Sequence, residues 1–451
     1  MFQTIGLAEE IQPDTFVSPG MRFVNGRGEL LLDWPRPQEI GPDGWHASYR
    51  FHQPDLERSL RTGVERLDRV EARLRCDVFA LDEAADHAVL RYENLATGAL
   101  EQATARYVIG CDGARSVVRR FMGAPIEDLR SHERWLIVDL LLKNPRPDLP
   151  SVTVQYCDPA RPLTMIRMYG ERRRWEFMLM PGDDPAVMTR PERIWQLLSR
   201  WITPEEAEIE RAIIYTFHSV LVRGWREGHM LLAGDACHQT PPFMGQGMCA
   251  GIRDAANLAW KLAAVIRGGS EATLLDSYED ERSPHVRQYI DTAVRLGGII
   301  QATDPEIVAR RDLELATNPT MMASIKPLLG RGLHGDAPPP AGMLSKQPRL
   351  ANGRRLDDAV GYRFALICKD NIANGISAET RARLRAAEFA ILSDAGDEIS
   401  AYLDELAAAA VIIRPDRYIL GSANSAPELD ALVARALRAT DRRDARALRT
   451  A

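Results

Sequence analysis

The chain has 451 residues, 45% of them hydrophobic and 27% charged, which is enough for roughly two or three domains with apolar cores. Its formal net charge of −6 argues against a nucleic-acid partner and against an anionic membrane surface. No stretch has the uninterrupted apolar length of a membrane span, and the first ten residues hold two glutamates and no basic cluster, which argues against a signal peptide.

The six cysteines form neither a CxxC motif nor a His/Cys spacing that is typical of zinc ligands. They are expected to be reduced and mostly buried thiols, without disulfides. The sequence therefore predicts a cytoplasmic protein with no bound metal.

The first part of the chain predicts helices and strands in alternation. Residues 2–11 read as the end of a helix, and residues 21–50, where Gly, Pro and aromatic residues interrupt short apolar runs, read as strands and loops. Apolar residues every three or four positions predict a helix over residues 54–67, with acidic residues in its first turn. Strands are expected at residues 88–94 and 103–110.

The middle of the chain, between residues 134 and 220, is β-rich. Strands are expected there over residues 135–142, 151–156, 163–169 and 175–180. The basic run at residues 172–174 would stand at a hairpin tip and is interpreted as a solvated turn. Two helices follow, over residues 251–267 and 272–290, the second broken or kinked at Pro284.

A polyproline stretch at residues 336–340 marks the best domain boundary in the chain. Beyond it the pattern predicts strands over residues 363–369 and 409–414 and helices over residues 379–390 and 428–440. This α/β module has no CxxC motif, so Cys368 alone predicts no disulfide chemistry.

One stretch, residues 234–248 (GDACHQTPPFMGQGM), carries more functional information than the rest. It follows an apolar strand, places Asp235 at its end, crosses a Pro/Gly loop and leads into an amphipathic helix. Backbone N–H groups at such a helix start suit an anion or an electron-rich ring. A Gly-Asp pair alone is most often a cap or a loop brace, but the prolines and glycines that follow favour a ligand site. His238 is interpreted as a loop-stabilising residue and not as one member of a Cys/His dyad.

A second carboxylate motif, GCDGARSVVR at residues 110–119, also ends an apolar strand. Asp112 either caps the next helix or binds a ligand at its N-terminus, and the two roles can coexist. Gln53 precedes a predicted helix, and its position alone indicates a plain polar residue. Residues 245–250 match the loose pattern GxGxxA, but a long loop separates them from the strand, so they are not interpreted as a dinucleotide fingerprint.

These two motifs, in this order and with these neighbours, resemble the flavin-contacting motifs of class A aromatic-ring monooxygenases, the p-hydroxybenzoate hydroxylase fold. The similarity is greatest to the 3-(3-hydroxyphenyl)propionate hydroxylase and phenol hydroxylase branch. The resemblance implies FAD as cofactor and NAD(P)H as a transient co-substrate. The cofactor contacts that it implies are Gln53, Asp112, Arg115, Asp235, Pro242, Gly245, Gly247, Met248 and Cys249.

The resemblance also implies a role for each part of the two motifs. Asp235 would bind the ribityl hydroxyls, and Gln53 would touch the same region. Pro242 would form a wall beside the oxygen-reactive position of the ring, while backbone N–H groups at residues 247–249 would face its pyrimidine edge. The motif with Asp112 and Arg115 would serve both FAD and the passing NAD(P)H.

The fold that the resemblance implies is α/β. A Rossmann-like FAD-binding domain would occupy residues 1–133 and 223–335, with a small excursion into the substrate domain near residues 21–50. In the family a βαβ unit with a GxGxxG fingerprint precedes the segment at which this chain opens, and that unit is expected to be missing. An inserted β-sheet substrate domain would span residues 134–222. A thioredoxin-like domain, structural or dimer-forming, would span residues 342–451.

The expected reaction is hydroxylation of a phenolic substrate with dioxygen and NAD(P)H through a flavin hydroperoxide. Such chemistry needs no protein nucleophile, which agrees with a sequence that shows no catalytic triad. The candidate catalytic residues are Arg167, Tyr215 and His218, among further possible substrate contacts at Tyr156, Tyr169 and Trp175. An inward arginine would suit a carboxylate, and a tyrosine or histidine could take up the phenolic proton.

Two alternatives stay open at this point. The same fold could hydroxylate a polyketide-type aromatic ring, or the chain could be a truncated, catalytically incapable paralogue that acts as a binding or dimerising protein. The expected partners are a small aromatic substrate, dioxygen and a second copy of the chain in a homodimer, with no nucleic acid and no membrane.

Overall fold

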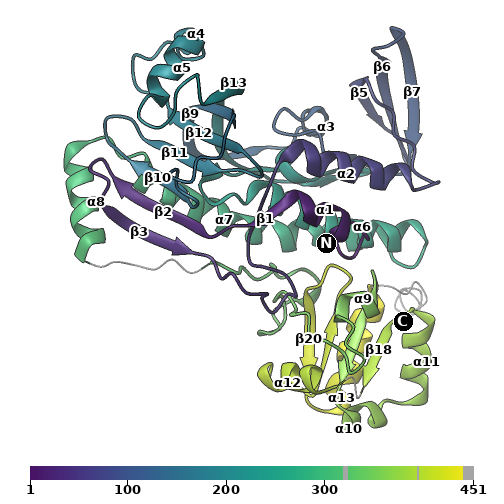
Figure 1. Cartoon of the computed structure of the whole chain (residues 1–451). Helices are drawn as coiled ribbons and strands as arrows, with labels where there is room; N and C mark the ends of the chain where they lie inside the picture. The colour runs from purple at the N-terminus through teal and green to yellow at the C-terminus, as the bar shows by residue number, and fades with distance from the viewer. Residues whose placement is uncertain (318–323, 394–395, 440–451) are drawn as a thin grey trace.

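A computed structural model describes residues 1–317, 324–393 and 396–439. Figure 1 shows an upper part, which ends with helix α8 (Pro305–Thr317), and a smaller lower part made of the C-terminal strands and helices. None of the described helices combines the length and the apolar composition that a membrane crossing requires.

The largest element of the upper part is an eight-stranded sheet with the order β16-β13-β9-β12-β11-β10-β2-β3. Within this sheet β10 and β2 are parallel, and all other neighbouring strands are antiparallel. The strands are β2 (Gly20–Asn25), β3 (Leu30–Pro35), β9 (Ile126–Leu142), β10 (Thr153–Cys157), β11 (Leu163–Arg167), β12 (Arg172–Met178), β13 (Ala207–Val222) and β16 (His238–Gln239).

The two faces of this sheet differ because successive side chains of a strand point to opposite sides. On one face Leu136, Val138 and Trp175 are buried in a core that includes residues of helix α5 (Pro191–Leu198), which follows α4 (Pro185–Met188). On the other face Trp135 and Ile137 belong to a second core with residues of α7 (Ser277–Ile300).

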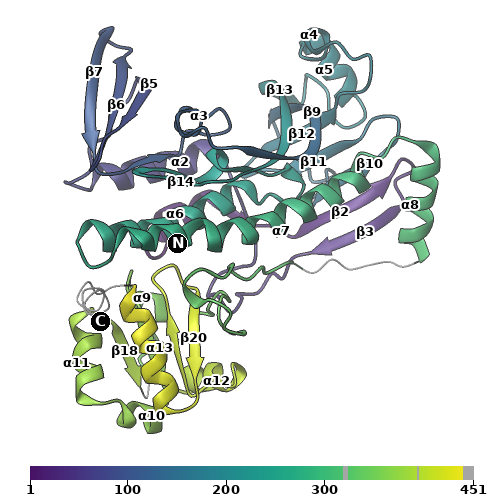
Figure 2. The same cartoon turned by 180° about the vertical axis from the view of Figure 1, so that it is seen from behind.

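A second, short sheet with the order β14-β15-β8 brings distant segments together. Strand β8 (Val108–Gly110) lies parallel to β15 (Met230–Leu232), which also pairs with β14 (Arg226–Glu227). Helix α3 (Val117–Met122) follows β8, and α6 (Gly247–Ile266) follows β15. From behind, α6 and α7 run as long helices between the strands above and the C-terminal part below (Figure 2).

The N-terminal segment packs against the same assembly. Helix α1 (Ala8–Ile11) contacts α2 (Gln53–Glu65) through Leu7, Ile11 and Leu56. Between these helices β1 (Thr15–Val17) pairs with β4 (Tyr49–Phe51). A three-stranded meander then projects from the upper part in Figure 1: β5 (Cys76–Glu83), β6 (Ala88–Asn94) and β7 (Ala99–Ala105).

The C-terminal part is a four-stranded sheet with the order β18-β17-β19-β20. Its strands are β17 (Ala365–Cys368), β18 (Ala390–Ser393), β19 (Ala410–Ile413) and β20 (Ile419–Ala423). Strands β17 and β18 are parallel and the other pairs antiparallel. Its helices are α9 (Leu356–Val360), α10 (Asp370–Gly375), α11 (Ala378–Ala386), α12 (Asp397–Glu405) and α13 (Ala426–Arg438). This βαβ unit followed by an antiparallel pair and a helix is the thioredoxin-like arrangement that the resemblance implied.

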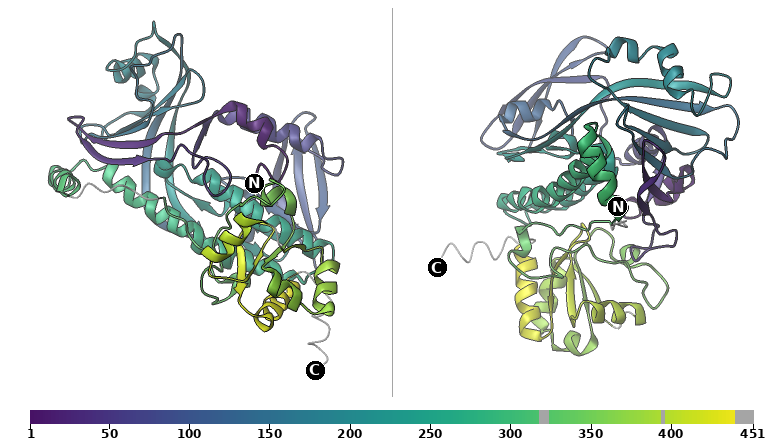
Figure 3. Two further views of the ribbon diagram at one scale, coloured as in Figure 1. Left: turned by 60° about the horizontal axis from the view of Figure 1, so that its bottom comes forward. Right: turned by 90° about the vertical axis from the view of Figure 1, so that its left-hand side faces the viewer.

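A side view shows the large sheet, the long helices and the C-terminal part as successive layers (Figure 3, right). The layering reflects where apolar stripes lie in the sequence. Helices α6 and α7 bury residues toward both neighbours, as an internal helix layer must.

Several expected elements differ from those observed. The strand expected over residues 103–110 is two strands, β7 and β8, which belong to different sheets. The helix end expected over residues 2–11 is limited to α1, because turns that include Gly6 at φ +77° precede it. The basic run at residues 172–174 is not a turn: it forms the start of β12. Residue 440, the expected end of the last helix, lies outside the described residues.

Of the break or kink expected at Pro284, the break was wrong, because α7 continues through this residue, whereas the kink stays a prediction. A proline in a helix leaves the carbonyl four residues earlier, here that of Asp280, without its usual donor. Gly330 lies against this turn so closely that a Cβ there would be 2.0 Å from the Asp280 oxygen, and its N–H donates to the Glu281 carbonyl at 2.9 Å. The backbone of Gly330 thus packs against the turn of α7 that lacks a helical hydrogen bond, and it bonds the adjacent carbonyl.

Candidate functional site

The two carboxylate motifs lie side by side because β8 and β15 are parallel neighbours. Gly110 is opposite Leu232, and the Ala233 N–H donates to the Gly110 carbonyl at 3.0 Å. The carboxyl ends of parallel strands meet at one edge of a sheet, so Asp112 and Asp235 leave the sheet at the same edge, where ligands bind in open α/β sheets. Both side chains are exposed, as is that of Arg115.

Asp112 caps helix α3. Its Oδ2 accepts hydrogen bonds from the N–H groups of Val117 at 2.6 Å and Val118 at 3.1 Å. The sequence had allowed a capping role for Asp112, and the structure shows it. Because both hydrogen bonds go to Oδ2, Oδ1 of Asp112 is left to bind a ligand.

Arg119 joins the two loops, a role that the sequence interpretation missed. The residue is buried, and its guanidinium donates to the Ala236 carbonyl at 2.8 Å and to the Ala114 carbonyl at 2.7 Å. A buried guanidinium between two loops fixes their separation, since each charged hydrogen bond contributes roughly 1.5–3 kcal/mol. The sequence signal was slight: an arginine three residues after Ser116, the helix cap.

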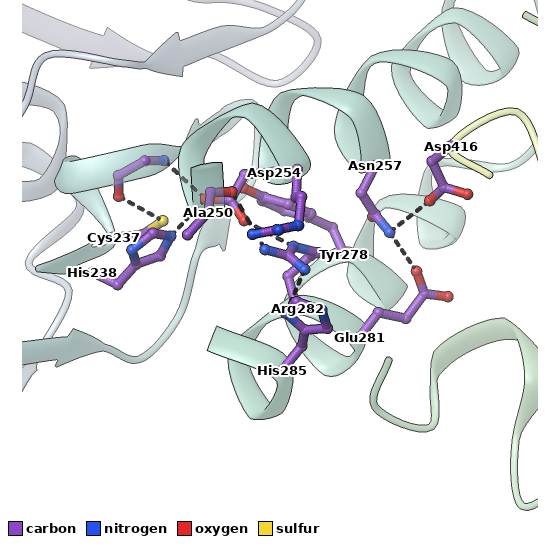
Figure 4. Close-up of polar contacts among 12 residues, drawn as sticks. Cys237, His238, Ala250, Asp254, Asn257, Tyr278, Glu281, Arg282, His285 and Asp416 are labelled. Carbon is purple, nitrogen blue, oxygen red and sulfur yellow. Dashed lines mark hydrogen bonds and ion pairs between the residues drawn. The ribbon is translucent and has the colours of Figure 1, made fainter. Parts of the chain in front are cut away.

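The loop that carries Asp235 rests on a buried carboxylate, Asp254 of α6 (Figure 4). Asp254 accepts hydrogen bonds from the Gly234 N–H at 3.1 Å and from Arg282 Nε at 2.9 Å, and it pairs with His238 Nε2 at 2.6 Å. Burial alone would raise the pKa of Asp254, but His238 and Arg282 hold it below its ordinary value. His238 thus braces the loop as expected, while the Cys237 thiol donates to the Gly234 carbonyl.

Cys237, His238 and Asp254 also lie close enough together to be compared with a metal site. However, both oxygens of Asp254 already accept hydrogen bonds, and a cation beside them would face the guanidinium of Arg282. The cluster is therefore best interpreted as a hydrogen-bonded brace. Its sequence signal is a polar stripe on one face of α6, where Asp254, Asn257 and Lys261 are all fully buried.

Glycine lets the loop approach α6 closely. Gly234 has φ +63°, and a Cβ on Gly251 would lie 3.2 Å from the Cα of Gly234. The two glycines thus bring the end of β15 against the first turns of α6.

A cavity of about 1580 Å³ opens at the start of α6, between this helix, the large sheet, the N-terminal segment and the C-terminal part. Its lining includes these residues predicted to contact the cofactor: Gln53, Pro242, Gly245, Gly247, Met248 and Cys249. The other three, Asp112, Arg115 and Asp235, lie outside the lining, at the strand ends. The volume exceeds the roughly 300–1,000 Å³ of a pocket for one small molecule, so it has room for a flavin ring and a substrate together.

The cavity presents groups that fit a flavin. The first N–H groups of α6, at residues 247–249, have no acceptor within their own helix. A Cβ at Gly245 or Gly247 would meet no atom within 4 Å, so both face open space. The buried hydroxyl of Thr240, also in the lining, has no hydrogen-bond partner among the described residues. Donors at a helix start and an open glycine loop suit an electron-rich ring edge that becomes anionic on reduction.

The face of the sheet that covers the cavity is polar. Arg174 and Arg211 both donate to Asp139, at 2.6 and 2.9 Å, and Arg172 donates to Glu210 at 2.9 Å. Further along the sheet the Thr164 hydroxyl donates to Gln155 at 2.6 Å, Arg50 donates to Thr153 at 2.8 Å, and Glu176 is 7% exposed. The group called the polar roof below consists of Arg50, which belongs to β4 in the β1–β4 pair, and of these residues on the face of the large sheet: Asp139, Thr153, Gln155, Thr164, Arg172, Arg174, Glu176, Glu210 and Arg211.

The predicted substrate contacts are scattered. Tyr215 lines the cavity. Arg167 lies over the ring of Phe16, with 5.0 Å from its guanidinium carbon to the ring centroid, and His218 Nδ1 is 2.7 Å from His132 Nδ1. Neither belongs to the lining.

The other aromatic candidates also lie away from the cavity. Tyr156 and Trp175 pack near Trp201 on the opposite face of the sheet, and Tyr169 donates to the Pro13 carbonyl at 2.9 Å. Successive residues of a strand point to opposite faces of the sheet. The sequence did not reveal which of the two alternating sets of side chains faces the cavity.

The chain is similar to known flavoproteins along most of its length. Residues 1–293 match a family described as an FAD binding domain. The chain is 36% identical to the probable NADH-specific resorcinol 4-hydroxylase of Rhodococcus jostii (strain RHA1), over 96% of this chain and 84% of that protein. It is 32% identical to the 3-(3-hydroxy-phenyl)propionate/3-hydroxycinnamic acid hydroxylase of Mycolicibacterium gilvum (strain PYR-GCK), over 95% and 81%.

Solved structures share the fold. The flavin-dependent monooxygenase PieE, in complex with FAD and substrate, matches 97% of this chain and 90% of its own at a TM-score of 0.79 and 20% identity. Aklavinone-11 hydroxylase, in a ternary complex with FAD and aklavinone, matches 97% and 89% at a TM-score of 0.73 and 21% identity.

The fold and the similarity to these relatives together define a flavoprotein monooxygenase that acts on aromatic rings and uses NAD(P)H. The chain belongs to the FAD-binding-domain family of these aromatic hydroxylases.

Proposed function

We propose that this chain hydroxylates a single-ring phenol of the resorcinol or 3-hydroxyphenylpropionate type, with NADH as the reductant. The supporting observation is the shared cavity: cofactor residues at the start of α6 lie on one side and the polar roof on the other. The names of the two relatives above supply the substrate types and the nicotinamide.

We infer that FAD is held by the two carboxylate loops and the start of α6. Asp235 would accept hydrogen bonds from the ribityl hydroxyls, and Gln53 could accept or donate them there. Asp112 and Arg115, at the strand ends, would lie toward the phosphate-bearing part. Pro242 would shield one side of the ring, and the N–H groups of Gly247 to Cys249 would stabilise negative charge at its edge. When bound, FAD supplies the redox chemistry, namely reduction by the nicotinamide and activation of dioxygen.

The remaining work of the protein is to orient an electron-rich ring, to exclude water and to favour the phenolate. The polar roof faces the loop of residues 240–249 across the cavity and offers donors and acceptors for ring hydroxyls. Tyr215, within the lining, is the predicted catalytic residue that can exchange a proton with the phenol. Arg167 and His218 keep their predicted roles only if the substrate extends beyond the cavity.

Hydroxylation of a larger, polyketide-type ring is the second candidate. The cavity volume of about 1580 Å³ favours it, because that volume exceeds the need of a flavin ring and a single-ring phenol. Substrate profiling separates the two candidates.

The test begins with the purified chain, mixed with FAD and passed through gel filtration. We expect a retained flavin spectrum, then NADH oxidation that depends on resorcinol or 3-(3-hydroxyphenyl)propionate and yields a product heavier by one oxygen atom. A chain that keeps no flavin would favour the catalytically incapable paralogue. Flavin retention with turnover of multi-ring phenols alone would favour the polyketide-type alternative.

We also infer that the protein works in the cytoplasm as a homodimer. The six cysteines are free in the structure, which suits a reducing compartment, and NADH is supplied there. Exposed apolar side chains such as Leu74 and Leu100 near and on the β5–β7 meander offer a contact surface. Light scattering distinguishes a monomer of 50.4 kDa from a particle of twice that mass.

A further inference from the structure

Glu176 is a carboxylate of the polar roof that accepts no hydrogen bond from the described residues. It lies on β12, opposite Ile137 of β9 and Thr164 of β11, and it is 7% exposed. Its nearest cation, Arg174 Nη1, is 3.9 Å away, beyond hydrogen-bond distance, while Arg174 itself donates to Asp139. Among the described residues no hydrogen bond reaches the Glu176 carboxyl, and burial raises its pKa. The carboxyl lines the cavity without a protein donor, so a ligand there can supply the hydrogen bond that it lacks.

Glu176 also stands at the right place for a substrate. Met178 is two residues after Glu176 on β12 and lies opposite Trp135 of β9. The ring of Trp135 packs edge-on against Phe243, which is in the loop that carries Pro242. Two residues of a strand span roughly 7 Å. Glu176 and the loop that carries Pro242 therefore line one cavity, and they are linked through neighbouring positions of the sheet.

Arg50 faces the same part of the cavity. Its Nη2 donates to Thr153, and its charge and that of Glu176 each favour the other's ionised form. The three other arginines of the roof each donate through two nitrogens to a carboxylate, Asp139 or Glu210. Arg50 thus keeps guanidinium donors that no carboxylate occupies, in the same cavity as the Glu176 carboxyl and within its electrostatic reach.

We propose that Glu176 and Arg50 form a subsite for the second polar substituent of the substrate ring, and that this subsite takes an uncharged hydroxyl in preference to a carboxylate, so that the cavity prefers phenols such as resorcinol. A hydroxyl donates to Glu176 and accepts from Arg50 at the same time, which matches the pair. A substrate carboxylate has no proton to donate and would place a second negative charge beside Glu176. The inference rests on the proposed function, since it assigns the substrate class of the same cavity.

The pair also provides a proton transfer. The substrate O–H bond breaks, the proton moves to a Glu176 oxygen, and the electron pair stays on the phenolate oxygen, which the Arg50 guanidinium stabilises. Deprotonation makes the ring more electron-rich at the positions ortho and para to the oxygen, where hydroxylation occurs. The total charge of the subsite does not change, so the step needs no counter-ion.

Binding to the oxidised FAD-loaded protein tests the proposal by calorimetry, with resorcinol and 3-(3-hydroxyphenyl)propionate as probes. We expect wild type to bind resorcinol more tightly. Glu176→Gln keeps the shape but cannot take the proton, and should weaken resorcinol binding about tenfold or more. Arg50→Lys should weaken it severalfold. Glu208→Gln, an exposed carboxylate on β13 outside the cavity, is the matched control and should bind as wild type does.

A second readout separates substrate contact from structural support. In Glu176→Gln, kcat with resorcinol should fall and should rise again at high pH, where the phenol ionises without help, while the flavin spectrum stays that of wild type. Tighter binding of the carboxylate substrate by wild type, or unchanged resorcinol binding in both variants, would overturn the proposal. Failure of the proposed function looks different: no flavin is retained, or neither phenol is hydroxylated.

Discussion

At the residue scale, Arg119 shows how one side chain can hold two distant motifs in register. Its guanidinium donates to the carbonyl of Ala114, 5 residues before it, and to that of Ala236, 117 residues after it. We expect Arg119→Met to weaken FAD binding about tenfold or more, because hydrogen bonds from a charged donor contribute roughly 1.5–3 kcal/mol each. Fluorescence titration of FAD measures the change.

The matched control for this variant is Arg120→Met. Arg120 is the next residue of α3 but is exposed, so its loss removes the same charge without touching either loop. An equal loss of FAD affinity in both variants would show that general positive charge, and not the bridge between the loops, is responsible.

His285 gives a prediction about pH. Arg282 donates to its Nδ1 at 2.8 Å, so Nε2 carries the hydrogen toward Tyr418, 3.2 Å away. Burial, with the charges of Arg282 and Arg253, lowers the pKa of His285 to about 2. The unfolded chain takes up this proton near pH 6.5. Stability is therefore fully present above pH 6.5 and declines as the pH falls toward about 2.

We expect the Tm of wild type to drop between pH 7 and pH 5, and the drop to be smaller in His285→Gln. Glutamine can still accept from Arg282 and donate to Tyr418 but takes up no proton in the unfolded state. His87→Gln, at a half-buried position between β5 and β6, should keep the wild-type drop. Identical pH profiles for wild type and His285→Gln would contradict the assignment.

The sequence could predict the residues of local motifs better than those with distant partners. Pro242, Gly247 and their neighbours stand in one recognisable loop, and the structure brings them into one cavity. Glu176 and Asp254 could not be identified in the same way, because a buried carboxylate is indistinguishable in sequence from a solvated one until its strand phase or helix face is known. Their meaning comes from tertiary neighbours.

At the scale of elements, the start of α6 depends on the absence of side chains. Gly251→Ala should push the Gly234 loop away from the helix, because the new Cβ would lie 3.2 Å from the Gly234 Cα, a backbone atom that cannot rotate aside. We expect weaker FAD binding and a lower Tm, despite the higher helix propensity of alanine. Titration of FAD and thermal unfolding report the two effects.

Gly298→Ala is the control for helix propensity. Gly298 lies inside α7, and a Cβ there would meet nothing within 4 Å. This variant should gain up to about 1 kcal/mol of stability with unchanged FAD binding. A stabilised Gly251→Ala with wild-type FAD affinity would show that the loop adapts and that the close approach is not needed.

Periodicity predicted most elements, and tertiary context explains the failures. Helix α7 continues past Pro284, where the backbone of Gly330 packs against it and the Gly330 N–H donates to the Glu281 carbonyl. Gly330 is 49 residues from Glu281 in sequence, so no local pattern could predict this contact. The basic run at residues 172–174 is part of a strand, in which Arg174 pairs with Asp139 on the adjacent β9 and Arg172 pairs with Glu210 on β13, the strand beyond β9. Composition alone favoured a solvated turn there.

At the scale of the whole molecule, the C-terminal part is fastened to the long helices by buried charges. Glu281 of α7 accepts from Arg414 at 2.7 and 2.8 Å and from Lys261 at 2.8 Å, and Arg414 also pairs with Asp416. All four side chains are almost fully buried. Arg414 and Asp416 come from the segment after β19, whereas Lys261 and Glu281 come from α6 and α7, so the network crosses between the layers of Figure 3.

This attachment predicts that the two parts unfold together. Arg414→Met leaves the Glu281 carboxylate buried with one cation fewer, and removing one partner of a buried ion pair costs about 3–5 kcal/mol. Lys346→Met breaks the exposed pair with Glu405, which is worth about 0–1 kcal/mol, and serves as the control.

Urea unfolding followed by tryptophan fluorescence and by circular dichroism should give one coincident transition for wild type, shifted to lower urea in Arg414→Met. Two separate transitions in wild type, or equal shifts in both variants, would show that the buried network does not couple the parts. In that case the cavity residues contributed by the C-terminal part, such as Tyr418, would have to be positioned by the surrounding loops instead.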